Sequence, residues 1–137
     1  YWTIASTGNA SDFGDLSTAR NVSANISNGV RSVMGGGQNA PADQGAVSGT
    51  KENIMEYVTI ASTGNVTDFG NLTVARSNNG GTSSSTRGVF MGGTDGSGSN
   101  VIDYITIAST SNATDFGDLT VARQAGGSAS DGHGGLQ

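Results

Sequence analysis

Apolar residues in this chain follow the spacing of β-strands rather than that of a helix. The segment from Val101 to Ile107 is rich in β-branched, aromatic and apolar residues on both of its faces. No window of about 11 residues places apolar side chains at helical intervals. A strand that is apolar on both faces must be covered on both sides. We therefore expect an all-β chain in which each sheet stacks between similar sheets.

Four strands are predicted between residues 77 and 123, separated by turns rich in glycine, asparagine, serine and aspartate. They are Gly81 to Ser85, Arg87 to Gly92, Val101 to Ser109 and Asp115 to Ala122. Gly92 and Gly93 end the second strand, where a positive φ is easy for glycine. The segment from Ser111 to Thr114 supplies the turn between the third and fourth strands, because its Asn and Thr side chains can bond nearby backbone.

One stretch of sequence occurs three times, at residues 3–20, 59–76 and 106–123. The tyrosines before the copies and the arginines that close them both step by 56 and then by 47 residues. The segment from Arg31 to Tyr57 is nine residues longer than that from Arg87 to Tyr104, so the earlier unit has a longer loop, roughly Gln38 to Thr50. Repetition at this period predicts stacked supersecondary units.

The residues that recur in the two full units form a recognisable series. In the later unit it reads Val89-Phe90-Met91-Gly92-Gly93, Tyr104, Phe116 and Arg123, and in the earlier unit Val33-Met34-Gly35-Gly36, Tyr57, Phe69 and Arg76. Over almost the whole chain this series resembles the kelch repeat, although phenylalanine stands where the kelch family usually has tryptophan. The segment TDFGDLTVAR and the closing His-Gly-Gly-Leu are also similar to kelch-like repeats in predicted structural proteins of marine bacteriophages.

The kelch resemblance implies an all-β fold, a β-propeller of four-stranded antiparallel blades, with about three blades in this segment. Residues 1–20 would be the outer half of a blade, 21–76 a complete blade with the nine-residue loop extension, 77–123 a complete blade, and 124–137 an inner half. Closed propellers typically have about four to eight blades. Either the chain is a stretch of a longer protein, or two or three copies close one ring; a start inside a repeat favours a fragment or a processed product.

Positions shared by the units are expected to hold the scaffold. They are Tyr1, Tyr57, Tyr104, Phe13, Phe69, Phe116, Asp12, Asp68, Asp115, Arg20, Arg76, Arg123, Gly35, Gly36, Gly92 and Gly93. We expect the aromatic side chains to lie between units. We expect the repeated aspartates and arginines to hold strands or neighbouring units together through charge-assisted hydrogen bonds, in preference to forming a ring of ligand-binding carboxylates.

Positions that differ between units are the better candidates for binding. The loop extension contains the only proline and small polar residues, so its candidate binding residues are Gln38, Asn39, Pro41, Asp43, Gln44 and Lys51. Trp2, where the later copies have Val58 and Ile105, is a candidate interface residue, with packing on an outer strand as the alternative.

Composition and charge exclude several classes of function. The net charge of −5 and the isoelectric point near 4.4 argue against nucleic acid and anionic membrane surfaces as partners. No apolar stretch is long enough for a membrane-spanning helix. The chain has no cysteine and one histidine, His133, so we expect no disulfide, no bound metal, no cofactor and no nucleophilic catalysis.

Two local patterns imitate catalytic or metal-binding motifs. Asp-Phe-Gly occurs three times, but none of the other segments of a protein kinase surrounds it. The segment Asp95 to Asn100 begins like a calcium loop, yet Thr106 stands where such a loop has glutamate.

These observations predict a non-enzymatic structural and adhesive module. The phage resemblance implies a virion or tail appendage, and so a virion or extracellular location, with loops presented to a protein or glycan receptor. Further contacts are expected with other copies of the chain or with further repeats of a longer chain. The alternatives are a kelch-like scaffold for intracellular protein–protein interaction and a subunit of an extracellular β-rich fibre.

Overall fold

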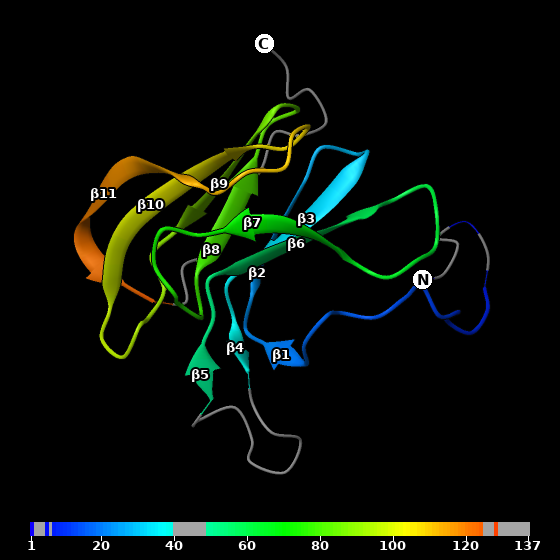
Figure 1. Ribbon diagram of the computed structural model, residues 1–137, viewed down its shortest axis with the longest axis horizontal. Coiled ribbons are helices and arrows are strands. Elements are labelled where there is room, and N and C mark those ends of the chain that lie inside the picture. The colour runs from blue at the N-terminus through cyan, green and yellow to red at the C-terminus, as the bar shows by residue number, and fades with distance from the viewer. Residues whose placement is uncertain (2–4, 6, 40–48, 125–127, 129–137) are drawn as a thin grey trace.

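The structure, a computed structural model, describes residues 1, 5, 7–39, 49–124 and 128. In these residues the chain is all-β without a helix, and its strands form three antiparallel sheets of three or four strands (Figure 1). The prediction of an all-β fold is therefore confirmed. Within the described ranges, no helical segment has the length and apolar character needed to cross a bilayer.

The first four-stranded sheet belongs to residues 21–76, which we call the second unit. Its strands are β2 (Ala24–Ser27), β3 (Arg31–Gly35), β6 (Ile54–Thr59) and β7 (Thr67–Asn71), and they pair in the order β2-β3-β6-β7. Asn28 forms the β2–β3 turn, since its Oδ1 accepts hydrogen bonds from the backbone N–H groups of Val30 (3.1 Å) and Arg31 (2.9 Å). The sheet is a simple antiparallel meander.

The second four-stranded sheet belongs to residues 77–123, the third unit. Its strands are β8 (Gly80–Ser83), β9 (Arg87–Met91), β10 (Ser99–Thr106) and β11 (Thr114–Arg123), in the order β8-β9-β10-β11. Each of the four strands predicted for this unit overlaps one of them. The register repeats as well, because Val33 pairs with Tyr57 in the first sheet and Val89 with Tyr104 in the second.

A small third sheet forms the base of the loop extension. It consists of β1 (Arg20–Asn21), β4 (Gln38–Asn39) and β5 (Thr50–Lys51), in the order β1-β4-β5. Gln38 pairs with Lys51 across 13 residues, whereas in the third unit Thr94 bridges Gly98 across only four. The nine extra residues of the second unit therefore lie between Gln38 and Lys51, where the sequence spacing places them.

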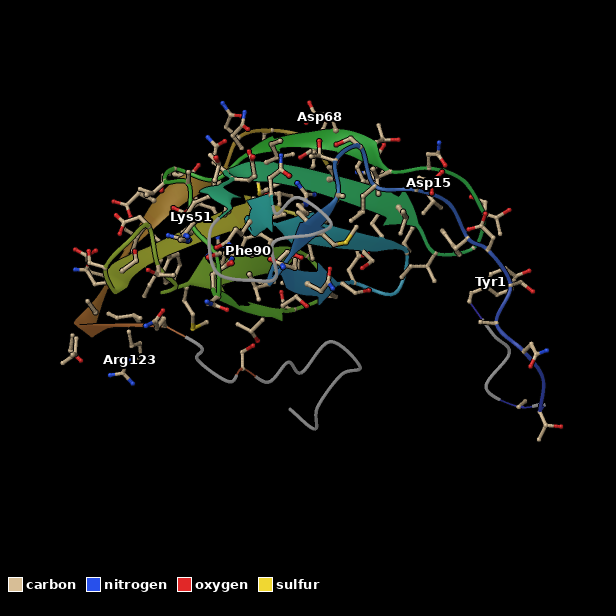
Figure 2. The ribbon with its side chains drawn as sticks, turned by 90° about the horizontal axis from the view of Figure 1, so that it is seen from below. Tyr1, Asp15, Lys51, Asp68, Phe90 and Arg123 are labelled. Carbon is tan, nitrogen blue, oxygen red and sulfur yellow. The ribbon has the colours of Figure 1, made fainter. Side chains whose placement is uncertain are left out.

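The two large sheets pack against each other through β2 and β8. Ile26 of β2 fills the space beside Gly88, where an added Cβ would lie 1.8 Å from Ile26 Cδ1. Phe90 lies in the same interface, pressed on Gly35, and Figure 2 shows it between the sheets. Ser83 Oγ ties the sheets at one end by donating to Ser27 O at 2.8 Å. The buried apolar residues are Ala24, Ile26, Val33, Met55, Phe69, Leu72, Phe90, Ile105 and Ile107.

A glycine pair ends the second strand of each large sheet. Gly36 and Gly37 have φ values of 69° and 108°, and Gly92 and Gly93 have 62° and 102°, a backbone shape that strongly favours glycine. Gly37 N donates to Arg76 O, and Gly93 N to Arg123 O, both at 2.9 Å. The pair in the second unit is thus Gly36-Gly37, while Gly35 stands in β3 at the place that Met91 takes in the third unit.

Candidate functional site

The base of the predicted binding loop is partly buried. Gln38 is buried, and Lys51 Nζ donates to its Oε1 at 2.8 Å, so these two side chains hold the base of the loop together. Asn39 is exposed at the end of β4. The remaining predicted binding residues of the loop, Pro41, Asp43 and Gln44, lie outside the described residues, as does Trp2. Asn39 is therefore the described candidate most accessible to a partner.

The repeated tyrosines and phenylalanines form one aromatic pair in each unit. The rings meet edge to face, with centroids 5.9 Å apart for Tyr1 and Phe13, 6.0 Å for Tyr57 and Phe69, and 5.7 Å for Tyr104 and Phe116. In the two large sheets, these pairs join the third strand to the fourth. The same aromatic pair therefore recurs in residues 1–20, which we call the first unit, and in the second and third units.

An arginine from the start of the second strand completes the pair in both large sheets. The guanidinium of Arg31 lies 4.5 Å from the centre of the Tyr57 ring, and that of Arg87 lies 4.6 Å from the centre of the Tyr104 ring. Arg31 also reaches the third unit, since its Nη1 donates to Ala108 O at 2.9 Å. Each of these tyrosine rings is therefore covered by an arginine of its own sheet, and the contact between them contributes to the packing of that sheet.

Two fully buried charged groups join the second unit to the third. Arg76 Nη2 lies 2.9 Å from Asp103 Oδ2, and both side chains are fully buried. The Asp103 carboxylate also accepts hydrogen bonds from Thr73 N (3.2 Å) and Thr73 Oγ1 (2.5 Å). Burial lowers the pKa of the Arg76 guanidinium, and the attraction of Asp103 opposes that shift. Arg76 closes one repeat and Asp103 stands in the next, so this ion pair joins consecutive units.

An equivalent ion pair joins the first unit to the second. Arg20 is hydrogen-bonded to Glu56, and both side chains are buried. Glu56 and Asp103 each stand directly before the repeated tyrosine, Tyr57 or Tyr104. Sequence reasoning identified the arginines but missed these acids. The signal was present, because an acidic residue precedes the tyrosine of both full units.

The aspartates that precede the repeated phenylalanines have a different role. Asp12, Asp68 and Asp115 are all exposed, and none of them contacts a repeated arginine in the described residues. Asp12 Oδ1 accepts from Gly14 N at 3.1 Å and Asp115 Oδ1 from Gly117 N at 3.0 Å, so these carboxylates shape a local turn. Figure 2 shows Asp68 on the outer surface of the sheet. The units are therefore joined by the arginines and not by this aspartate series.

A second contact between units joins the outer strand of one unit to a loop of the next. Asn71, at the end of β7, donates its N–H to Asn112 Oδ1 at 3.0 Å and accepts at its C=O from Ala113 N at 2.8 Å. A Cβ added at Gly70 would lie 2.4 Å from Ser111 O, so the loop is packed directly on the backbone of β7. Asn112 thus bonds to the preceding unit, where the sequence suggests only a local turn.

The same loop contact occurs one unit earlier. Asp15 N donates to Asn65 Oδ1 at 3.0 Å, and Asp15 O accepts from Val66 N at 3.1 Å. A Cβ added at Gly14 would lie 2.2 Å from Gly64 O. We call this combination of loop contact and buried arginine–acid pair the unit joint. It is built twice, with equivalent residues each time.

The third unit presents the first half of such a joint to solvent. Arg123 is exposed, and Figure 2 shows it at the end of β11, at the periphery of the molecule. Phe116 is 54% exposed, whereas its counterpart Phe69 is 2% exposed. A Cβ added at Gly117 would meet no atom within 4 Å. In the described part of the chain, the outer edge of β11 is not covered by a following loop.

The described residues hold no group of three or more His, Cys, Asp or Glu side chains that could bind a metal ion. In the calcium-like segment, Asp95 Oδ1 accepts from Ser97 N at 3.2 Å and from Ser97 Oγ at 3.3 Å. The hydrogen bond from the Ser97 backbone lowers the pKa of Asp95. This carboxylate closes the tight turn between Thr94 and Gly98.

Comparison of the sequence with protein-family models and with curated proteins finds no match. The kelch-like and phage-like resemblances of the sequence therefore receive no support from these comparisons.

Proposed function

We propose that this chain is a non-enzymatic structural and adhesive module of a virion or tail appendage, in which propeller-like repeat units present a loop to a protein or glycan receptor. The observation that carries the structural part is the unit joint. Two successive joints use equivalent hydrogen bonds and the same kind of buried ion pair. The repeated contact residues therefore bind each unit to the next one. Repeat proteins of this kind gain their stability from neighbouring units.

The adhesive part rests on the difference between two equivalent turns. In the third unit a short turn joins Thr94 to Gly98, whereas in the second unit the sequence has nine more residues between the paired Gln38 and Lys51. Because residues of the joints are committed to packing, a loop that only one unit possesses is the better candidate for binding a partner. The virion and the propeller come from the sequence resemblances.

The loop can be tested with a graft taken from the chain itself. In this variant the three residues Asp95, Gly96 and Ser97 replace everything between Gln38 and Lys51, which gives the second unit the short turn of the third. We expect the graft to melt within a few degrees of the parent and to lose binding on a glycan or receptor array. An unchanged binding profile would contradict the adhesive role of the loop.

A fibre subunit is the second candidate function, favoured by the uncovered edge of β11. Electron microscopy of the native assembly separates the candidates, since virion spikes, closed rings and continuous filaments have different shapes. A kelch-like intracellular scaffold predicts isolated rings, with neither spikes nor filaments.

A further inference from the structure

The outer edge of β11 already has the backbone shape that the two joints use. Gly117 has a φ of 132°, close to the 146° of Gly14 and the 136° of Gly70. Gly117 N is held by Asp115 Oδ1 as Gly14 N is held by Asp12 Oδ1. The difference is that a following loop covers Gly14 and Gly70, whereas the space beside Gly117 is open. A partner would meet an edge that needs little rearrangement, which lowers the cost of binding.

The first unit carries the complementary loop. Residues 7–11 occupy the place in the first unit that residues 63–67 and 110–114 occupy in the second and third. Asn9 corresponds to Asn65 and Asn112, the two residues whose Oδ1 atoms accept the joint hydrogen bond. Asn9 is exposed, and Tyr1 and Phe13 on either side of this loop form the same edge-to-face pair as their counterparts in the other two units. No outer strand lies on this loop in the described residues.

We propose that the edge of β11 in one copy of the chain binds the loop of residues 7–11 in a second copy, head to tail. Asp118 N would donate to the partner's Asn9 Oδ1, and Asp118 O would accept from the partner's Ala10 N, as Asn71 does with Asn112 and Ala113. Head-to-tail contacts of this kind form a ring when the rotation closes and a filament when it does not. This inference rests on the proposed structural function, because it extends the loop contact between units of one chain to a contact between two copies.

The proposal concerns the loop contact alone. In the two internal joints the buried acid stands directly before the repeated tyrosine. The proposed contact assigns no acid to Arg123. Association between copies through this contact should increase with protein concentration.

Sedimentation velocity of the full chain over a wide range of concentrations tests the proposal. We expect the parent to form species larger than a monomer as its concentration rises. Gly117→Val fills the space that the partner loop needs and should keep the chain monomeric. Gly96→Val is the matched control, because Gly96 has a similar φ of 137° and the same open surroundings but lies in the Thr94–Gly98 turn. A parent that stays monomeric, or two valine variants that associate equally, would overturn the proposal.

A second pair of variants avoids any strain in the backbone. Asn9→Ala removes the proposed acceptor and should raise the dissociation constant about fivefold, the effect of one hydrogen bond. Asn100→Ala, an exposed asparagine of β10, should leave it unchanged. Equal dissociation constants for these two variants would also overturn the proposal. The outcome is separable from the adhesive role, since the loop graft should lose receptor binding while its self-association persists.

Discussion

Residues 67–76, which begin with β7, have nearly the same sequence as β11 in different surroundings. Residues 67–76 and 114–123 differ only at Asn71 and Asp118. Yet Phe69 is 2% exposed and Phe116 is 54% exposed, and Arg76 is buried while Arg123 is not. The difference is the unit that follows, because the third unit covers β7 with its loop and with Asp103. Burial in this chain is therefore decided by the neighbouring unit rather than by the local sequence.

This comparison assigns an energetic role to each repeated residue. A residue at a joint should be important for stability when the next unit is present and nearly neutral when it is absent, as expected for nearest-neighbour coupling in repeat proteins. Matched substitutions at equivalent positions of successive units test this directly, since each pair changes the same residue type.

The largest difference is expected for the arginines. Arg76→Met leaves the Asp103 carboxylate buried without its cation and should lower the free energy of unfolding by about 3 to 5 kcal/mol. Arg123→Met should change it by no more than about 0.5 kcal/mol, since Arg123 is exposed. Urea titration followed by circular dichroism measures both.

A double variant sharpens the arginine comparison. Two nitrogens of the buried Arg76 guanidinium, Nε and Nη1, make no hydrogen bond in the described structure. Their lost hydration reduces the net stability that the ion pair contributes. Arg76→Met combined with Asp103→Leu removes both charges and should recover most of the lost stability. A double variant as unstable as Arg76→Met alone would show that the lost stability comes from packing and not from the uncompensated charge.

The phenylalanines should show the next largest difference. Phe69→Ala removes a ring from the buried cluster and should cost about 3 kcal/mol, which thermal melting detects as a fall of several degrees. Phe116→Ala removes a half-exposed ring that packs on Tyr104 and should cost about 1 kcal/mol. Equal shifts in the two melting temperatures would contradict the role of the third unit in covering β7.

The glycines of the outer strands should differ by less. Gly70→Ala must push Ser111 O away and should cost about 2 kcal/mol or more, from the contact and from the positive φ together. Gly117→Ala carries the φ penalty alone and should cost about 1 kcal/mol. The comparison requires dilute protein, so that association between copies does not add to the stability.

The smallest effect is expected for the loop asparagines. Asn112→Ala removes the acceptor of the Asn71 N–H and should cost about 1 kcal/mol in a urea titration. Asn9→Ala, the same change in the loop that no described strand covers, should have no measurable effect in dilute solution. A comparable loss of stability in both variants would show that these asparagines stabilise their own turns and not the contact between units.

The repeat itself predicted much of the fold. The alternation of turns and β-branched segments located the strands of the third unit. The arginine-to-tyrosine spacings placed the extra residues roughly from Gln38 to Thr50, and the structure places them between Gln38 and Lys51. These features depend on local sequence and on register, which a single chain displays directly.

The sequence was less informative about which residues meet across units. Glu56 and Asp103 are different residue types and lie outside the repeated segments 59–76 and 106–123. A comparison that looks for identical residues therefore does not find them. Phe69 and Phe116 share one local sequence, and only the position of the third unit separates their exposures. Contacts between units depend on the three-dimensional arrangement, which repetition alone does not specify.

Chemical labelling of arginine is the most direct test of the central claim that the following unit buries the joint. The folded chain at low concentration is treated with a dicarbonyl reagent, and the modified arginines are read by mass spectrometry. The account predicts that Arg20 and Arg76 stay unmodified while Arg123 reacts. Equal modification of Arg76 and Arg123 in the folded chain would contradict it.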